Sequence, residues 1–426
     1  MNVIINKIRE EFPALSQQMN GKNLIYLDNA ATTQKPKSVL SLLEKMSGEI
    51  NANVHRAMYD LSNKATILYE GAREDVRKFI NAPKRENIIF TSGATASINL
   101  VAKSFCEKFL KKGDSVLIAA DSHHSNIVPW QLAVEKVGGE IKVLPVDSNG
   151  ELCIEQLNSL IDSKVKIVAC SHISNILGII NPIEEIVKIA HDKGVPVLID
   201  GAQGIVHCKV DVQELDCDFY VFSTHKIYGA TGSGVLYGKE ELLNKMPPYM
   251  GGGDMVDTVR FEKTTYAPLP LKFEAGTPNF IGNATLSPAL SFLDCVRGNR
   301  EERLFDNIEN KEISKSVKKE EENIKEFVYQ ALQHDVKDVE IYGNPKNPEK
   351  KIPLFSFNIK NCNSSDIAQI LDKLGIAIRS GLMCAEPLLN RFGANGALRA
   401  SFAMYNTLEE AQKFIEALVK AKKMLS

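Results

Sequence analysis

Two stretches of the chain carry residue types that could do chemistry together. In residues 218–226 a short apolar run ends in a polar turn that holds a serine, a histidine and Lys226. In residues 197–203 another apolar run ends at Asp200. Burial at a strand end lowers the pKa of a lysine, and a partly neutral lysine can form a Schiff base with an aldehyde. An acid at another strand end can pair with a pyridinium nitrogen, so the two stretches together favour a pyridoxal phosphate (PLP) site.

Cys384 is the candidate nucleophile. It lies in a loop bounded by Gly381 and Pro387, whereas several of the eight cysteines fall in predicted strands or helices, where cysteine behaves as a small hydrophobe. Arg379 is near in sequence and favours the thiolate, which is the reactive form. On these residues alone, both a structural and a nucleophilic role for Cys384 stay open.

Two further features are typical of ligand contacts. Small residues at 92–97 follow a predicted strand and open a helix, whose free N–H groups can bind an anion, and Thr95 adds a hydroxyl. Asn175 follows a strand on the side of an open α/β sheet where ligands bind. Each feature is common without a ligand, but together with Asp200 and Lys226 they favour a phosphate-bearing cofactor.

Length and composition limit the class of protein. The chain has 426 residues, 44% apolar and 24% charged, with a net charge of −2. It is long enough for two domains, and its charge gives no general attraction to nucleic acid or an anionic membrane. There is no CxxC pair, and the His123-His124 pair lacks an acid-rich partner cluster, so we expect no metal site. The N-terminus lacks the apolar core of a signal peptide and no apolar run is long enough to span a membrane, which favours the cytoplasm.

The spacing of apolar residues predicts the elements that must position these groups. Strands and helices alternate through the first part of the chain, which argues for a mostly parallel α/β sheet, and a compact α+β arrangement follows. Strands are predicted at about 23–27, 87–91, 115–119, 141–145, 165–170, 197–200, 218–222, 233–237, 339–342, 352–359, 376–379 and 397–401. Helices are predicted at about 60–80, 92–111, 151–161 and 183–193, and after Ser365 and Thr407, with a capping box at Thr407 and Glu410 and a helix stop at Gly375.

The motifs are similar to those of a known family. ValLeuIleAspGlyAlaGln at 197–203, PheSerThrHisLysIleTyrGly at 222–229 and the ArgxGxxCysAlaxPro pattern at 379–387 resemble class V aminotransferase-fold enzymes. The resemblance is greatest to SufS/CsdA-type cysteine desulfurases, and runs from Phe12 to Leu425. It implies PLP fold type I, with a large mostly parallel α/β domain and a smaller α+β domain. It also implies conversion of L-cysteine to L-alanine with a persulfide on the enzyme, a homodimer, and transfer of sulfur to an acceptor or iron–sulfur scaffold protein.

The resemblance assigns roles to individual residues. It implies that Lys226 holds PLP and acts as a base, Asp200 pairs with the ring nitrogen, and His123 stacks on the ring and exchanges protons. Cys384 would attack the substrate sulfur, and Arg399 would bind the substrate carboxylate. The full cofactor-binding set expected is Ala94, Thr95, His123, Asn175, Asp200, Gln203, Ser223, His225, Lys226 and, from a partner chain, Thr277. The substrate-binding set expected is Arg399, Asn175, Ala30 and Arg379.

The chain departs from the family pattern at some positions near these residues. Leu382 and Met383 replace the pair of histidines that most SufS relatives have before the cysteine, which leaves the origin of local acid–base help open. Ala96 stands where many relatives have an acid. The resemblance also places His55 and Arg56 facing the active site.

Domain boundaries are predicted at residues 15–295 for the large domain and 1–14 with 296–426 for the small one. A charged insertion at about 300–325 is expected to be a lengthened solvated helix or a helical excursion. A selenocysteine lyase, or another class V enzyme such as an aminotransferase, would share every feature except the weight placed on Cys384, so these activities remain alternatives.

Overall fold

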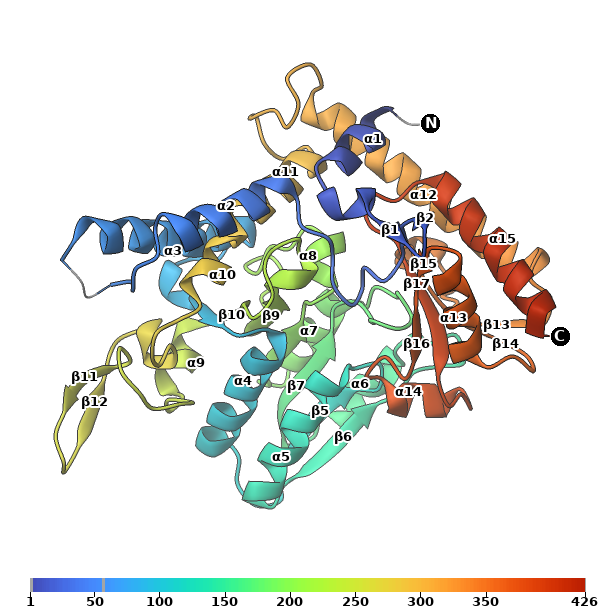
Figure 1. The fold of residues 1–426 in the computed structure, drawn as a ribbon. Helices are drawn as coiled ribbons and strands as arrows, with labels where there is room; N and C mark the ends of the chain where they lie inside the picture. Colours follow the sequence, from blue (N-terminus) through green and yellow to red (C-terminus); the bar gives the residue numbers. More distant parts are fainter. Residues whose placement is uncertain (1–2, 56–57, 426) are drawn as a thin grey trace.

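A seven-stranded sheet forms the centre of the computed structural model, which describes residues 3–55 and 58–425 (Figure 1). Strand β10 is antiparallel to both of its neighbours, and the other paired strands run parallel, so the predicted mostly parallel sheet is confirmed. In order across the sheet, the strands are β4 (Ile88–Thr91), β10 (Gly234–Gly238), β9 (Phe219–Ser223), β8 (Val197–Asp200), β7 (Val165–Ser171), β5 (Ser115–Ala119) and β6 (Glu140–Leu144).

Both faces of this sheet are buried under helices. Along β9, Tyr220 and Phe222 belong to one apolar cluster and Phe219 and Val221 to another, because successive side chains point to opposite faces. The first cluster includes residues of α3 (Asp60–Phe79), α6 (Ile154–Leu160), α7 (Ile183–His191), α8 (Gly204–His207) and α11 (Leu286–Arg297). The second includes residues of α4 (Ala94–Phe109), α5 (Val128–Val137) and α9 (Glu240–Lys245).

The C-terminal part forms a second, antiparallel sheet with its own core. Its strands, in order, are β13 (Val339–Tyr342), β14 (Leu354–Ile359), β17 (Ala397–Ser401) and β16 (Arg379–Gly381). Helices α12 (Asn310–His334), α13 (Ser364–Lys373) and α15 (Leu408–Leu425) pack on it through a third apolar cluster (Figure 1). The domain boundaries stay a prediction.

The remaining elements are short or lie at the edges. They are α1 (Val3–Glu10), α2 (Lys37–Gly48), α10 (Phe280–Ala284), α14 (Glu386–Arg391), β1 (Gln18–Met19), β2 (Lys22–Asn23), β3 (Ile25–Tyr26), β11 (Val256–Val259), β12 (Thr264–Tyr266) and β15 (Ile376–Ala377). In the described part of the chain, no helix is both long and apolar enough to cross a membrane.

Two local predictions about strands were wrong. The predicted strand at 376–379 is divided, because β15 pairs in parallel with β3 whereas Arg379 begins β16 and pairs with β17. The predicted strand at 23–27 is also divided, since β2 pairs with β1 and β3 pairs with β15. The chain therefore changes sheets at both places, and an apolar run alone does not reveal such a change.

The predicted helix ends were confirmed. Thr407 Oγ1 accepts a hydrogen bond from Glu410 N at 3.2 Å, and Glu410 Oε2 accepts one from Thr407 N at 3.1 Å, which is a capping box. Gly375 follows α13 with a φ of 85°, which glycine adopts without strain.

The charged segment at 300–325 is helical only in its second half. Helix α12 begins at Asn310, whose side chain accepts from Leu304 N and donates to the carbonyl oxygens of Arg300 and Glu302. These bonds fold residues 300–309 back on the helix start. Val317 and Ile324 of this helix are buried, so its apolar side faces the core.

We predict opposite effects on stability from two glycine-to-alanine substitutions. In Gly234→Ala the new Cβ would lie 2.4 Å from Gly93 Cα, a backbone atom that cannot rotate away, so stability should fall by about 1–3 kcal/mol. In Gly71→Ala, on an exposed position of α3 with nothing within 4 Å, stability should rise by about 0.5–1 kcal/mol. Urea-induced unfolding of both variants checks this, and equal midpoints would contradict it.

Candidate active site

Three strands of the central sheet end side by side at one cavity. Ser171, Asp200 and Ser223 are the last residues of β7, β8 and β9, and all three line a cavity of about 310 Å³. Lys226 lies in the single 3-10 turn (Thr224–Lys226) that follows β9 and also lines this cavity. The carboxyl edge of an open α/β sheet is where such folds bind ligands.

The cavity gathers nearly all the residues selected from the sequence. Its lining includes Ala30, Ala94, Thr95, His123, Asn175, Asp200, Gln203, Ser223, His225, Lys226, Arg379, Cys384 and Arg399. Thr277 is exposed and is not part of this lining. Ala31, Ser125, Ser171, Ile173, Ala202 and Met383 also line it and were not predicted. His55 was expected to face the site but is not part of this lining, and its Nε2 donates to Glu70 Oε1 at 3.0 Å. Arg56 lies outside the described residues.

The turn that carries Lys226 is fixed by Thr33. The carbonyl oxygen of His225 accepts from both Thr33 N and Thr33 Oγ1 at 3.1 Å, and Thr33 Oγ1 accepts from Tyr228 N at 2.9 Å. Burial lowers the pKa of Lys226, and the Asp200 carboxylate opposes this shift. A lysine held in this way has a larger neutral fraction than one in water, which suits a nucleophile or a base.

Asp200 is buried and keeps one carboxylate oxygen available. Its Oδ1 accepts from Ala202 N at 3.0 Å. Burial raises the pKa of Asp200, and the charge of Lys226 acts in the opposite direction. An acid in such a place can pair with a cationic ring nitrogen, which would lower its pKa again.

His123 is a neutral imidazole with a defined proton position. Burial first, and then the charge of Lys226, lower its pKa from 6.5 to about 3. Its Nδ1 accepts from Ser125 N at 3.0 Å, so the proton of the neutral ring is on Nε2. The ring can therefore donate one hydrogen bond through Nε2 but does not carry a positive charge at neutral pH.

The start of helix α4 can hold an anion. Its N-cap residue, Gly93, makes no side-chain cap, and Ala94 N donates to Ser223 Oγ at 2.8 Å. Gly93 has a φ of 150°, which a residue with a side chain rarely adopts, and this lets the backbone enter the helix beside β10. Unfilled N–H groups and the helix dipole suit a phosphate here, next to the hydroxyls of Thr95 and Ser223.

Two buried polar atoms indicate that a ligand completes the site. Among the described residues, eight side-chain polar atoms are buried without a hydrogen-bond partner, and two of them, Asn175 Oδ1 and Arg399 Nε, belong to residues of this cavity. Because buried polar atoms are nearly always paired, these two fit a polar ligand that carries both a donor and an acceptor. An anion site, an acid and an amine around one cavity match the groups of PLP.

The loop of Cys384 forms part of the wall of this cavity. Cys384 is exposed, and both Met383 and Cys384 have positive φ values, of 45° and 54°. Asn175 Nδ2 donates to the carbonyl oxygen of Met383 at 3.0 Å, and His124 N donates to that of Cys384 at 2.8 Å. Glu386 N donates to His124 Nε2 at 3.2 Å. Left-handed backbone costs non-glycine residues on the order of 1–3 kcal/mol, so these bonds hold a conformation that the loop would otherwise leave.

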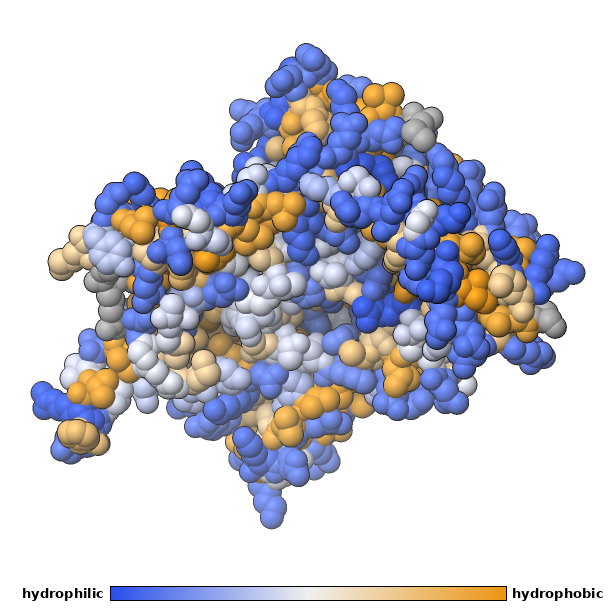
Figure 2. Space-filling view, viewed as in Figure 1, coloured by the Kyte–Doolittle hydropathy of each residue, from blue (hydrophilic) through white to orange (hydrophobic). Residues whose placement is uncertain are grey.

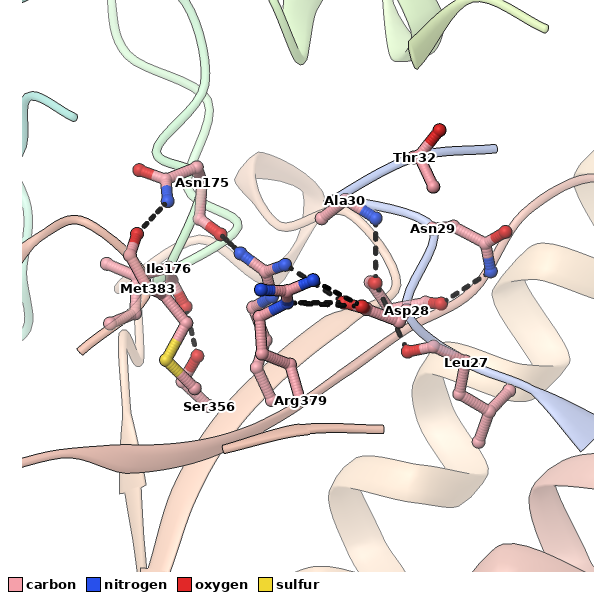
Figure 3. A network of polar contacts seen from close by, with 12 residues as sticks. Leu27, Asp28, Asn29, Ala30, Thr32, Asn175, Ile176, Ser356, Arg379 and Met383 are labelled. Carbon is pink, nitrogen blue, oxygen red and sulfur yellow. Dashed lines mark hydrogen bonds and ion pairs between the residues drawn. The ribbon is translucent and has the colours of Figure 1, made fainter. Parts of the chain in front are cut away.

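Asp28 is a residue of the site that the sequence analysis did not select. It accepts hydrogen bonds from Arg379, as Figure 3 shows, and from Arg399. Arg379 was expected to support the Cys384 thiolate; its Nε and Nη2 donors are directed at Asp28, while its charge also interacts with Cys384. The sequence signal that could have identified Asp28 is the same as for Asp200, namely an acid directly after an apolar strand.

Comparison with known proteins agrees with this arrangement. The model of the family described as aminotransferase class V matches residues 25–414. A probable cysteine desulfurase of Vibrio cholerae is 42% identical over 425 residues, which covers 100% of both chains. The chain belongs to the class V aminotransferase family.

Solved structures of the family agree as well. The crystal structure of the cysteine desulfurase CsdA from Escherichia coli has a TM-score of 0.87 and 35% identity, covering 99% of each chain. An apo cysteine desulfurase from Thermococcus onnurineus has a TM-score of 0.86 and 34% identity, covering 97% of this chain and 98% of that one. The predicted fold class and the resemblance to cysteine desulfurases are therefore confirmed. Class V aminotransferases are PLP-dependent enzymes, so the predicted enzyme class is confirmed too.

We predict that His123 stays neutral between about pH 5 and 8, where an unperturbed histidine would titrate. The reason is burial beside Lys226, which lowers its pKa from 6.5 to about 3. Because the pKa falls on folding, His123 stabilises the fold above its unfolded pKa, and this contribution is lost as the pH falls through the folded value. Nitrogen-15 NMR of labelled histidines, assigned with His123→Asn, measures the titration. A midpoint for His123 near 6.5 would contradict the structure.

Proposed function

We propose that this chain is a PLP-dependent cysteine desulfurase, which takes the sulfur of L-cysteine onto Cys384 and releases L-alanine. The observation that carries the proposal is the position of the Cys384 loop, bonded to Asn175 and His124 across the cavity that contains Lys226. A lysine site for PLP would suit many reactions. A cysteine presented to the same cavity suits attack on a sulfur atom.

The cofactor would be held by groups around the cavity. Lys226 Nζ would bind its aldehyde carbon, Asp200 its ring nitrogen, and the start of α4 its phosphate, with Ser223 and His225 beside it. His123 would lie on the ring, and Gln203, whose Nε2 donates to Ala30 O at 2.8 Å, would border it. Bound PLP would supply an electron sink that makes the Cα proton of an amino acid removable.

The chain's own residues then have separate tasks. Arg399 binds the substrate carboxylate through donors that include its unpartnered Nε. Lys226 Nζ, kept partly neutral by burial, takes the proton from Cα and returns protons to the product. His123 donates a hydrogen bond from Nε2 inside the cavity.

Cys384 carries out the sulfur transfer. Its Sγ attacks the sulfur of L-cysteine, so that an S–S bond forms, the Cβ–S bond breaks, and Cβ gains a proton to give alanine. The electron pair of the broken bond stays with the carbon product, so no external oxidant is needed. The loop must then carry the persulfide outward, and its strained backbone, held by a few hydrogen bonds, is suited to such movement.

A second copy of the chain is proposed to complete the site. Thr277 is exposed, in a loop joined to Gly253 through the bond from Gly276 N to Gly253 O at 2.9 Å. The hairpin of β11 and β12 projects away from the body nearby, with apolar surface at the lower left of Figure 2. Phe261 on this hairpin is fully exposed, which supports contact with another chain. We assign Thr277 and residues 251–253 to the neighbour's PLP site.

Cellular context is proposed from the same chemistry. Cys384 would pass its sulfur to an acceptor or iron–sulfur scaffold protein, in the manner of the SufS type. All eight cysteines are free, which supports a reducing cytoplasm. Selenocysteine lyase and aminotransferase activities are the alternatives, and an aminotransferase would not need Cys384.

We predict that Cys384→Ser loses alanine release from L-cysteine by about a thousandfold or more, because serine lacks the sulfur nucleophile. The variant should still bind PLP. Mass spectrometry after treatment with L-cysteine should map one extra sulfur to Cys384 in the wild type and to no cysteine of the variant.

Cys362→Ser is the matched control, because Cys362 is half-buried on the surface of the other sheet and does not line the cavity. It should keep normal alanine release. Normal release by Cys384→Ser, or a persulfide mapped to another cysteine, would show that the proposed role of Cys384 is wrong.

A further inference from the structure

Two arginines face each other across neighbouring strands at the entrance of the carboxylate site. Arg379 on β16 and Arg399 on β17 are direct partners in the antiparallel register. Side chains in such a pair start about 5 Å apart on the same face of the sheet, and like charges there repel. Both arginines line the cavity, so the surplus positive charge lies where the substrate binds.

Asp28 contacts both arginines, and Figure 3 shows its bonds to Arg379. Its two oxygens accept from Arg379 Nε at 3.1 Å each, and Oδ2 also accepts from Arg379 Nη2 at 2.9 Å. Its Oδ1 accepts from Arg399 Nη2 at 3.2 Å. The Asp28 carboxylate therefore accepts from Nε and Nη2 of Arg379 and from Nη2 of Arg399.

The two arginines are held to different degrees. The Arg399 side chain is 3% exposed and the Arg379 side chain is 46% exposed. Arg399 has a second fixed contact, since its Nη1 donates to Asn175 O at 2.8 Å. With Nη1 and Nη2 each engaged, the plane of this guanidinium is set, and its Nε is left buried without a partner.

The backbone fixes the position of Asp28. Asp28 forms an isolated parallel β-bridge with Ser401, which lies on the same strand as Arg399. Ser401 N donates to Leu27 O at 2.7 Å, and Ala30 N donates to Ser401 Oγ at 2.9 Å. The backbone of Asp28 is thus placed by bonds on both sides of it, and this brings the carboxylate within reach of both arginines.

From this geometry we infer that Asp28 is a positioning residue that sets how the enzyme recognises the carboxylate of its substrate. The inference rests on the proposed function, in which Arg399 binds that carboxylate. Asp28 influences this recognition without touching the substrate. Its carboxylate neutralises the charge of Arg379 and fixes the orientation of the Arg399 guanidinium. The N–H groups of Arg399 that remain free can then bind the substrate carboxylate. Two guanidinium charges and one carboxylate leave a single positive charge, which matches an amino acid with one carboxylate.

The test uses the PLP-loaded enzyme and two variants of Asp28. Asp28→Asn removes the charge, and Asp28→Glu keeps the charge at a longer reach. Calorimetric titration measures binding of L-alanine, which has the carboxylate, and of ethylamine, which lacks it. Steady-state assays give KM and kcat for L-cysteine. Asp162→Asn is the matched control, since Asp162 is an exposed partner of Lys142 at 2.7 Å and does not line the cavity.

Asp28→Asn should raise the Kd of L-alanine and the KM of L-cysteine by at least about tenfold, the loss expected for a disturbed charge-assisted contact, while kcat changes less. The Kd of ethylamine should stay within about twofold, because it makes no contact with Arg399. Asp28→Glu should recover part of the loss for L-alanine, and Asp162→Asn should behave as the wild type.

Tighter binding of L-alanine by Asp28→Asn would overturn the inference, because Asp28 would then be a competitor for Arg399. An equal loss for L-alanine and ethylamine in either variant would also overturn it, since that is the effect of a merely structural role. The binding titrations need no turnover. If the wild type released no alanine from L-cysteine, the proposed function alone would fail, and the two Kd values would still decide the role of Asp28.

Discussion

The parallel direction of neighbouring strands is the constraint from which the site follows. Strands β7, β8 and β9 run the same way, so Ser171, Asp200 and Ser223 arrive at one edge, although they are far apart in the chain. Lys226 follows one turn later. The apolar residues of these strands are buried on both faces, so a shift of one residue would move each side chain into the opposite apolar cluster and disrupt the packing of both. Packing in the core therefore determines the placement of the polar groups at the edge.

Charge balance is the second condition for this site. Burial lowers the pKa of Lys226 and of Arg399, while Asp200 and Asp28 respectively oppose these shifts. Removal of either acid would leave positive charges close together in a poorly hydrated place, which is strongly unfavourable. The acids come from different sheets, since Asp200 ends β8 and Asp28 follows β3 beside Ser401. The charge balance thus depends on how the two sheets meet.

The parallel sheet and the main residues at its edge could be predicted from the sequence, because the patterns that indicate them span only a few neighbouring residues. Apolar runs that end in an acid or a polar turn identified Asp200 and Lys226, and alternation of strands and helices predicted the parallel sheet. The contacts of Asp28 could not be predicted in the same way, because Arg379 is 351 positions away in sequence. The division of the strand at 376–379 depends on pairing with β3 and β17. The neutral state of His123 depends on burial beside Lys226, which no motif encodes.

The proposed chemistry depends above all on the attachment of PLP to Lys226. It can be measured directly by loading the wild-type protein with PLP, reducing it with borohydride, and mapping the modified peptide by mass spectrometry. We expect the cofactor to be fixed to Lys226 alone, since this is the lysine that lines the cavity next to Asp200. The same treatment of Lys226→Ala should leave no lysine modified in the cavity. Attachment to a different lysine in the wild type would contradict the account.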